Sequence, residues 1–283
     1  MRMLRKAIIP LAGKGTRLLP VTAVIPKALF PLVGRDGRIK CVLHVILEQV
    51  RHAGVQDVAL VVSPGQAEMI EAYLDEARRG PGGAIPSRVT FIEQTDPRGF
   101  GDAVLCGAGF AGEEPFLVLL GDHIQIPTKS AKPCMTQVTE AFKKMGGVAM
   151  IGMHEVPTSE LSKVGVARGE PLEGRVYRCE DFIEKPELET ANGRLRTPGL
   201  EEGAFLAHCG IYAFSPEIFD CLREEAACNA HGLGEVELAG AQQRLLQRYP
   251  GNYYLLRIAG KAYDMGTPAG YMRTMAALGG ISA

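Results

Sequence analysis

The chain carries the stretch KAIIPLAGKGTRLLPVTAVIPKALFPL at residues 6–32. Residues 6–12 are almost continuously apolar and run into Gly13, a pattern typical of a central parallel strand that is covered on both faces. A glycine-rich turn with Arg17 follows, and Lys27 stands between two prolines. Glycine, fixed positive charge and proline in one stretch suit a polyphosphate better than a hydrophobic core. We therefore predict a buried strand that leads directly into a nucleotide site.

Length and composition bound the class of protein. With 283 residues, the chain is long enough for one large α/β domain or two smaller ones. Its formal net charge is -1, and because binding by bulk electrostatics normally shows as a basic excess, we predict no nucleic-acid and no membrane partner. Seven scattered cysteines without a C-x-x-C pair favour a reducing, cytoplasmic environment over disulfides or a zinc site. The first apolar run contains Pro10 and is short, so we interpret it as a strand and not as a signal peptide.

Strand and helix patterns alternate after the opening stretch. The sequence predicts, in order, a helix at 41–52, a strand at 58–63, a helix at 66–79, a strand at 88–95, a short helix toward 110 and a strand at 116–123. Repeated βα units of this length indicate a parallel sheet with helices on both faces. Because ligands of such sheets lie beyond the carboxyl ends of the strands, we expect the loop at 13–15, the turn at 99–101 and Asp122 to share one crevice.

Beyond residue 145 the pattern changes to apolar runs that are separated by polar segments. We predict that this half forms a mixed sheet, which extends the first sheet and closes over the site. Further elements are predicted as helices at 216–227, at 235–248 and from 268 onward, and as a strand at 253–260. The charged segment 187–202 indicates an exposed loop or hairpin.

The loop Gly13-Lys14-Gly15-Thr16-Arg17 matches neither of two familiar phosphate loops. A dinucleotide fingerprint needs a third glycine where the chain has Leu18, and a Walker loop needs a lysine followed by Ser or Thr after its last glycine. What remains is a loop whose backbone N–H groups approach an anion, with the Arg17 guanidinium beside them; a tight turn with a solvated basic rim is the alternative. Lys27, held among prolines, favours a phosphate site shared with Arg17.

Five ordered motifs carry a resemblance to a known family. They are G-x-G-T-R-x-L-P at 13–20 followed by Pro26-Lys27, Q-x-x-P-x-G-x-G-D-A-V at 94–104, Gly121-Asp122, Glu184-Lys185-Pro186 and Asp264-x-Gly266. In this order the chain resembles the sugar-1-phosphate nucleotidylyltransferases from Lys6 to about Ala277. Within that family it is most similar to the bacterial UTP:glucose-1-phosphate uridylyltransferases.

The resemblance implies a fold and a reaction. The fold is Rossmann-like three-layer α/β/α, with a mainly parallel central mixed sheet, in a single domain 1–283 whose nucleotide-binding part is 1–145 and whose sugar-binding, smaller β-rich part lies in 146–283. The partners are UTP and a sugar 1-phosphate, glucose 1-phosphate by resemblance, with Mg²⁺ as cofactor and a homodimer or homotetramer as the assembly.

In the implied reaction, the phosphate monoester of the sugar 1-phosphate attacks the nucleotide. This monoester is mostly dianionic at neutral pH, since its second pKa is about 6. No general base is therefore required, and catalysis rests on positioning and charge neutralisation.

The resemblance also implies roles for particular residues. Those with catalytic charge are Arg17, Lys27 and Lys185; those that bind the nucleotide are Ala12, Gly13, Gly15, Thr16, Gln94 and Gly99; those that bind the sugar are Gly165, Glu184, Lys185 and Gly210; those that hold Mg²⁺ are Asp122 and Asp264. Two carboxylates are a typical protein contribution to a Mg²⁺ site. The alternative interpretations are turn caps for the aspartates, a strand-end salt bridge for Glu184 and Lys185, and β-bulges for the glycines. Glu235 resembles a family glutamate near the sugar only loosely.

Departures from the family pattern leave the substrate open. Ala28-Leu29-Phe30 replaces the usual E-M-L, Phe205 replaces an asparagine before A-x-x-G-x-Y, and Ala239-Gly240 replaces Thr-Asp at a helix start. The alternatives are therefore a dTTP-using enzyme, a transferase for another sugar phosphate or, from a different class, a non-catalytic paralogue that binds nucleotide sugar. The intact basic residues and the aspartate pair favour an enzyme.

Overall fold

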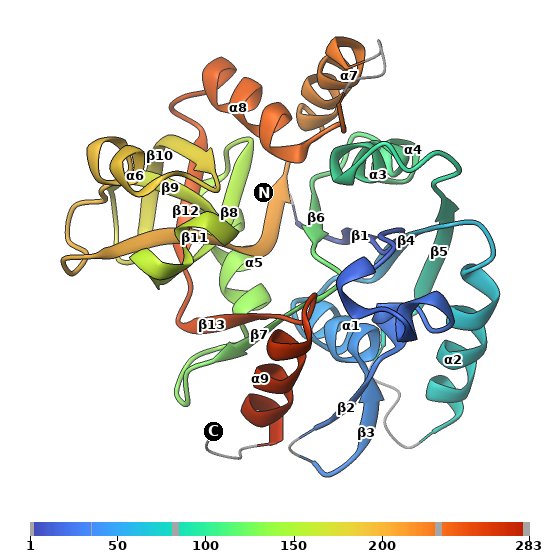
Figure 1. The fold of residues 1–283 in the computed structure, drawn as a ribbon. Helices are drawn as coiled ribbons and strands as arrows, with labels where there is room; N and C mark the ends of the chain where they lie inside the picture. Colours follow the sequence, from blue (N-terminus) through green and yellow to red (C-terminus); the bar gives the residue numbers. More distant parts are fainter. Residues whose placement is uncertain (1–2, 35, 81–84, 230–233, 280–283) are drawn as a thin grey trace.

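The computed structural model of the chain describes residues 3–34, 36–80, 85–229 and 234–279. The strands of its main sheet are β1 (Lys6–Pro10), β4 (Asp57–Val62), β5 (Arg88–Glu93), β6 (Phe116–Leu119), β8 (Ala149–Pro157), β9 (Gly165–Pro171), β10 (Val176–Glu184), β11 (Ala204–Phe214) and β12 (Tyr253–Arg257). They form one nine-stranded sheet in the order β5-β4-β1-β6-β11-β8-β12-β10-β9 (Figure 1). The sheet runs through both halves of the sequence.

The first half of the sheet is parallel. β1 lies between β4 and β6, so that Ile8 is opposite Ala59 on one side and Val118 on the other. β11 then pairs antiparallel with both β6 and β8, and β10 pairs antiparallel with β9 and β12, which makes the second half mixed. The predicted α/β class with a mainly parallel nucleotide half is confirmed.

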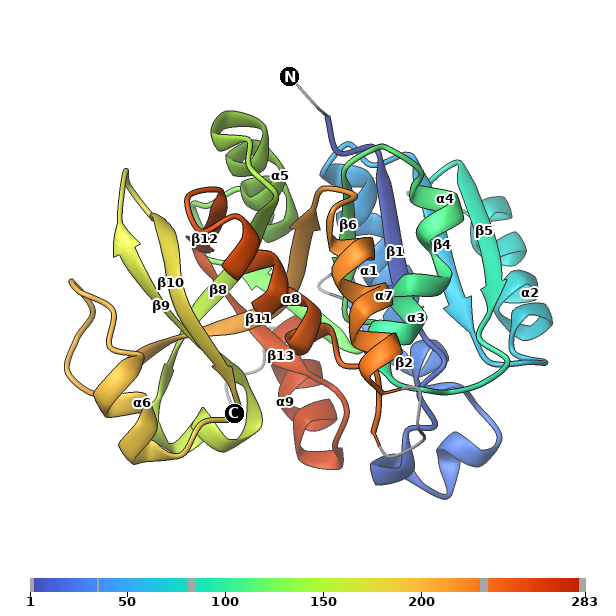
Figure 2. The same cartoon turned by 90° about the horizontal axis from the view of Figure 1, so that it is seen from above.

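Helices cover both faces of the sheet. They are α1 (Val42–His52), α2 (Ala67–Arg79), α3 (Phe100–Cys106), α4 (Ala108–Ala111), α5 (Cys134–Met145), α6 (Leu188–Arg194), α7 (Ile218–Cys228), α8 (Leu238–Arg248) and α9 (Pro268–Gly279). α1, α2 and α5 pack on one face, and α3, α4, α7 and α8 pack on the other (Figure 2). Because successive strand residues point to opposite faces, Ile9 lies in the first of these cores and Ile8 in the second. The unbroken apolar run of β1 follows from burial on both sides.

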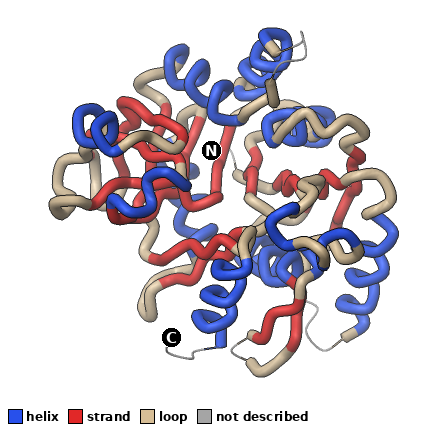
Figure 3. Tube along the Cα trace, viewed as in Figure 1, coloured by secondary structure: helices blue, strands red, loops and turns tan. Residues whose placement is uncertain are grey.

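Two small strand pairs lie beside α9. One is β2 (Pro31–Val33) with β3 (Ile39–Cys41), and the other is β7 (His123–Pro127) with β13 (Gly260–Asp264). Figure 3 shows both pairs as red segments next to the last helix, and α9 contacts β2, β7 and β13. The β7–β13 pairing places Asp264 directly opposite His123. Among the described residues, no helix is both long and apolar enough to cross a membrane.

The prediction of an exposed loop or hairpin at 187–202 was wrong, because this segment contains α6. Ala191 and Leu195 are fully buried there and pack against the far ends of β8, β9 and β11. Their helical spacing was hidden by the charged residues around them. The segment is therefore part of a third, smaller core.

The helix predicted at 235–248 begins only at Leu238. The Val236 N–H donates a hydrogen bond of 2.6 Å to the Arg98 carbonyl, and the Gly101 N–H donates one of 2.8 Å to the Val236 carbonyl. These long-range bonds hold the chain before α8 against the turn that precedes α3.

Three predicted strands are shorter than expected. The strand predicted at 88–95 ends at Glu93. The strand predicted at 253–260 ends at Arg257. The strand predicted at 116–123 ends at Leu119, and the chain then turns before β7 begins at His123. This turn carries Asp122 away from the sheet and toward β13.

Candidate active site

A cavity of 490 Å³ opens at the carboxyl ends of β1 and β6. Its lining residues are Pro10, Ala12, Gly13, Lys14, Lys27, Gln94, Pro97, Gly99, Phe100, Ala103, Leu120, Gly121, Asp122 and Glu235. The loop after β1, the turn at Gly99 and Asp122 thus share one cavity, as the strand order predicted. A larger cavity of 700 Å³ lies between β10 and α8, but Arg178 and Arg194 on its wall are already paired with carboxylates.

The glycine loop after β1 is folded back on Thr22. Gly15 has a φ of 61°, and a Cβ on it would lie 2.9 Å from the Thr22 methyl group, so only glycine suits this left-handed position. The Thr22 hydroxyl donates a hydrogen bond of 2.8 Å to the Gly15 carbonyl. Thr16, which follows, is exposed and begins a short 3₁₀ turn over Thr16–Leu18. The backbone of Ala12 and Gly13 is left facing the cavity.

Asp122 is held by a lysine and a histidine. Lys27 Nζ donates to Asp122 Oδ2 at 2.5 Å, and His123 Nδ1 lies 2.9 Å from Asp122 Oδ1. Burial by itself would raise the pKa of Asp122, but the hydrogen bond with His123 and the Lys27 charge outweigh it and hold that pKa well below its usual range. Burial would likewise lower the pKa of His123, but its hydrogen bond with Asp122 raises it instead. The carboxylate is therefore ionised at neutral pH.

Asp264 and Arg17 complete the charged end of the site. Asp264 Oδ1 accepts a hydrogen bond of 2.6 Å from the Gly266 N–H. A Cβ on Gly266 would lie 2.9 Å from Asp264 Oδ1, 3.1 Å from Arg17 Nη2 and 3.4 Å from Asp122 Oδ2, so three charged groups converge on the space that this glycine leaves. Asp122, His123 and Asp264 each place one ligand atom within 4.8 Å of the others. The two carboxylates fit a hard divalent cation such as Mg²⁺, which prefers oxygen ligands.

Gln94 lies at the opposite end of the cavity and is almost fully buried. Its Nε2 donates to the Gly99 carbonyl at 3.2 Å and to Asp102 Oδ2 at 2.7 Å, and Arg98 Nη2 donates to Asp102 Oδ1 at 2.7 Å. Both amide hydrogens are thus used, while the carbonyl oxygen has no partner among the described residues. Gly99 has a φ of 115°, and a Cβ on it would lie 2.8 Å from the Val236 carbonyl. Gln94 therefore presents an acceptor to the cavity.

A second group of predicted site residues lies where β9 and β10 meet. Gly165 begins β9 opposite Glu184 at the end of β10, and a Cβ on Gly165 would lie 2.7 Å from Glu184 Oε2. Burial raises the pKa of Glu184. Lys185 has a φ of 47°, and its N–H donates to the Val164 carbonyl at 3.1 Å. Its Nζ lies 3.6 Å from Glu184 Oε1, so the two charges point the same way.

Gly210 connects this group to the charged end of the site. Its φ of 81° produces a bulge in β11, where the pairing register with β8 shifts between His208 and Tyr212. A Cβ on Gly210 would lie 3.1 Å from Leu120 and 3.3 Å from the His123 ring. Of the described residues, neither Glu184 nor Lys185 lines the cavity around Gln94. The predicted sugar residues thus form a separate group, which Gly210 joins to His123.

Some residues of the site were not predicted from the sequence. His123 follows Asp122 directly, and Arg98 and Asp102 stand four residues apart within the Gln94 motif, so their positions gave a usable signal. His208 interrupts an apolar strand two residues before Gly210. Glu235, which the family resemblance suggested only loosely, lines the cavity.

Comparisons with known proteins find similar chains over nearly the whole sequence. The family model described as Nucleotidyl transferase matches residues 6–279. The chain is 34% identical to a Bacillus subtilis (strain 168) protein named "Putative UTP--glucose-1-phosphate uridylyltransferase", over 96% of this chain and 95% of the relative. It is 32% identical to "UTP--glucose-1-phosphate uridylyltransferase" of the same organism, over 97% and 90% of the two chains. A solved structure of UDP-glucose pyrophosphorylase complexed with UDP-glucose superimposes with a TM-score of 0.80 at 29% identity and covers 97% of this chain and 98% of that one.

Proposed function

Because this chain belongs to the nucleotidyl transferase family, we propose that it transfers a uridylyl group from UTP to glucose 1-phosphate and releases pyrophosphate. The observation that carries the proposal is that Lys27 and Asp122 line the same cavity as Gln94, with Arg17 and Asp264 next to Asp122. A nucleoside triphosphate has the matching layout of a base at one end and a polyphosphate at the other. The cavity gives each end a partner of suitable chemistry.

The buried amide of Gln94 supports a uracil or thymine base. With both amide hydrogens donated to Gly99 and Asp102, its carbonyl oxygen is available to accept the imide N–H of the base. Cytosine has an unprotonated ring nitrogen at that position, and two acceptors that face each other without a hydrogen are strongly disfavoured. UTP and dTTP share the imide, so a thymidylyltransferase is the second candidate function.

The charged end of the cavity supports phosphate transfer. Arg17 and Lys27 neutralise the triphosphate and the departing pyrophosphate, and Lys185 holds the phosphate of the incoming sugar. Asp122 and Asp264 would hold Mg²⁺, which neutralises charge on phosphate oxygens when it is bound. A homodimeric or homotetrameric assembly and a cytoplasmic location stay predictions.

Pyrophosphate release by the purified protein tests the function. With Mg²⁺ we expect the highest kcat/KM for UTP and glucose 1-phosphate, a lower value for dTTP, and little turnover with CTP; chelation of the metal should stop the reaction. Lys144→Gln is the matched control for loss of a lysine, since Lys144 pairs with Glu173 on the exposed surface. Tight UTP binding without turnover of any substrate pair would instead identify a nucleotide-binding paralogue.

A further inference from the structure

His208 occupies an unusual position for an imidazole. It lies in β11 opposite Met153 of β8, two residues before the bulge at Gly210. Its ring centroid is 5.6 Å from that of Phe182 and 5.7 Å from that of Tyr212, and the Tyr212 contact is edge-to-face. Two aromatic rings thus fix the orientation of the imidazole, while part of its surface stays accessible.

The imidazole packs against Gly165, beside Glu184. A Cβ on Gly165 would lie 3.1 Å from His208 Nδ1 and 2.7 Å from Glu184 Oε2. One nitrogen and one carboxylate oxygen therefore lie close together, and they can do so because residue 165 has no side chain. Gly165 and Glu184 belong to the group of residues that the proposed function gives to the sugar.

The nitrogens of His208 are free to bind a ligand. Among the described residues no side chain or backbone group forms a hydrogen bond with either of them. Burial of the ring lowers the pKa of His208 to about 4, with a smaller contribution from the nearby His154. The ring is neutral at pH 7, with one N–H donor and one acceptor nitrogen. A sugar hydroxyl, which both donates and accepts, matches such a group better than a phosphate does, because a phosphate favours a cation.

We propose that His208 selects the sugar by a hydrogen bond between its imidazole and a ring hydroxyl, beside the carboxylate of Glu184. This inference rests on the proposed function and deepens it, since it names a specificity residue for the second substrate. Deletion of the hydrogen bond lowers kcat/KM for the sugar phosphate by about tenfold.

Two substitutions separate this role from simple packing. His208→Leu keeps an apolar side chain between Phe182 and Tyr212 but removes the hydrogen bond, whereas His208→Asn places a polar atom near the position of Nδ1. We expect His208→Leu to lower kcat/KM for glucose 1-phosphate about tenfold with KM for UTP within about twofold of wild type, and His208→Asn to recover part of the loss. If Leu is tolerated and Asn is worse, the ring only packs, and the proposal is overturned.

Deoxy analogues of glucose 1-phosphate identify the hydroxyl. With wild type, the analogue that lacks the partner hydroxyl should lose about as much kcat/KM as His208→Leu does with the full substrate. With His208→Leu, that analogue should lose nothing more, while the others lose as before, because the two deletions remove one interaction. Losses that multiply for every analogue would overturn the proposal.

Binding measurements separate this inference from the proposed function. By calorimetry, His208→Leu should weaken binding of UDP-glucose about tenfold and leave binding of UDP unchanged. If wild type turns over no sugar phosphate at all, the proposed function fails. If wild type is active and the variant binds UDP-glucose as tightly as wild type does, only the role of His208 fails.

Discussion

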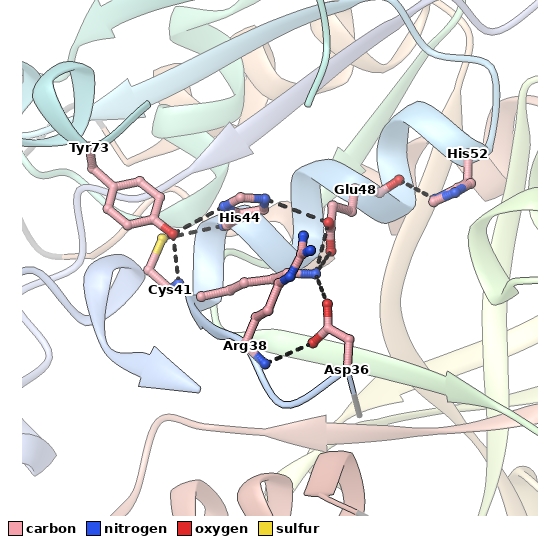
Figure 4. Close-up of polar contacts among 8 residues, drawn as sticks. Asp36, Arg38, Cys41, His44, Glu48, His52 and Tyr73 are labelled. Atoms are coloured by element: carbon pink, nitrogen blue, oxygen red, sulfur yellow. Dashed lines mark hydrogen bonds and ion pairs between the residues drawn. The ribbon is translucent and has the colours of Figure 1, made fainter. Parts of the chain in front are cut away.

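The molecule contains two clusters that are built from the same kinds of side chain. The cavity cluster consists of Lys27, Asp122 and His123. The hairpin cluster, at the junction of β3 with α1, consists of Lys40, His44 and Glu48 (Figure 4). Each cluster has one lysine, one carboxylate and one histidine, so composition alone does not distinguish them.

The hairpin cluster is surrounded by partners. Lys40 Nζ donates to Glu48 Oε1 at 3.0 Å and lies 3.1 Å from Asp36 Oδ2, which gives one lysine two carboxylates. His44 Nδ1 lies 3.0 Å from the Tyr73 hydroxyl, and its Nε2 lies 3.6 Å from Glu48 Oε1. Figure 4 shows these contacts joining the start of α1 to the hairpin and to α2. The arrangement ties three elements together.

The cavity cluster lies in a different setting. Asp122 faces Lys27 and His123, and Arg17 and Asp264 lie next to it, so basic and acidic groups are both present. Both Lys27 and Asp122 also line the cavity at the ends of the parallel strands. Charged groups beside an open cavity are accessible to a ligand, whereas a cluster with paired charges between packed elements stabilises the fold. Placement, more than residue type, separates the functional cluster from the structural one.

The largest effect on activity is expected when the cavity cluster loses its carboxylate. Asp122→Ala should lower kcat at least about a thousandfold, because it removes the acidic group that orients Lys27 and would hold the metal. The protein should still fold but with a lower urea midpoint, because Lys27 and His123 lose the carboxylate that they contact. Pyrophosphate release and urea unfolding measure the two effects. A folded Asp122→Ala protein with wild-type turnover would refute the assignment of the cavity cluster.

The next largest difference in activity is expected between variants of the two lysines. Lys27→Met should lower kcat/KM about a hundredfold, because a cation that neutralises phosphate charge is lost. Lys40→Met, the matched variant in the hairpin cluster, should keep turnover within about threefold of wild type and lower the urea midpoint, because Glu48 loses its lysine partner. Equal losses of activity in the two variants would show that the clusters are not distinct in function.

The carboxylate of the hairpin cluster tests stability. Glu48→Gln should lower the free energy of unfolding by about 1–3 kcal/mol with kcat unchanged, because the largely buried Lys40 side chain loses its charged acceptor.

Burial would raise the pKa of Glu48, but His44 and Lys40 outweigh it and lower that pKa below its ordinary value of 4.5. A lowered pKa in the folded state adds stability above pH 4.5 that is lost as the pH falls through the folded-state value. The difference between wild type and Glu48→Gln should thus shrink below pH 4.5, as urea titrations at several pH values would show; a gap that widens on acidification contradicts it.

The smallest effect is expected at the tyrosine of the hairpin cluster. The Tyr73 hydroxyl accepts a hydrogen bond of 3.0 Å from the Cys41 N–H and contacts His44. Tyr73→Phe should therefore cost about 1 kcal/mol of unfolding free energy without an effect on kcat. Tyr254→Phe is the control, because the Tyr254 hydroxyl bonds an exposed carbonyl of Gly251, and it should cost less than about 0.5 kcal/mol. Urea unfolding of both variants distinguishes them, and equal costs would argue against a structural role for Tyr73.

The parallel half of the fold was predictable from local sequence. A strand that is buried on both faces must be apolar throughout, and β1 and β4 satisfy this condition. Once the parallel order is inferred, the residues after each strand lie at one edge of the sheet, which brought Gly13, Gly99 and Asp122 into one prediction. The mixed half was harder, because the charged surface of α6 concealed its two buried positions, Ala191 and Leu195.

Local sequence does not predict that α8 begins only at Leu238. The backbone of Val236 forms hydrogen bonds with Arg98 and Gly101, which are remote in sequence, and these bonds compete with a helical conformation. Tertiary partners of this kind override helix propensity, since propensities amount to less than about 1 kcal/mol per residue. The same segment packs on Gly99 and so shapes the wall of the cavity near Gln94.

The sequence by itself determined the kinds of group that the site offers: a glycine loop, two basic residues, two aspartates and a buried amide. Only the tertiary structure decided which of them meet. Pairing of β7 with β13 places Asp264 opposite His123. The absence of a side chain at Gly165 allows His208 and Glu184 to approach each other. The physical reason is that helix and strand periods are local properties, whereas the register between distant strands depends on the packing of the whole sheet.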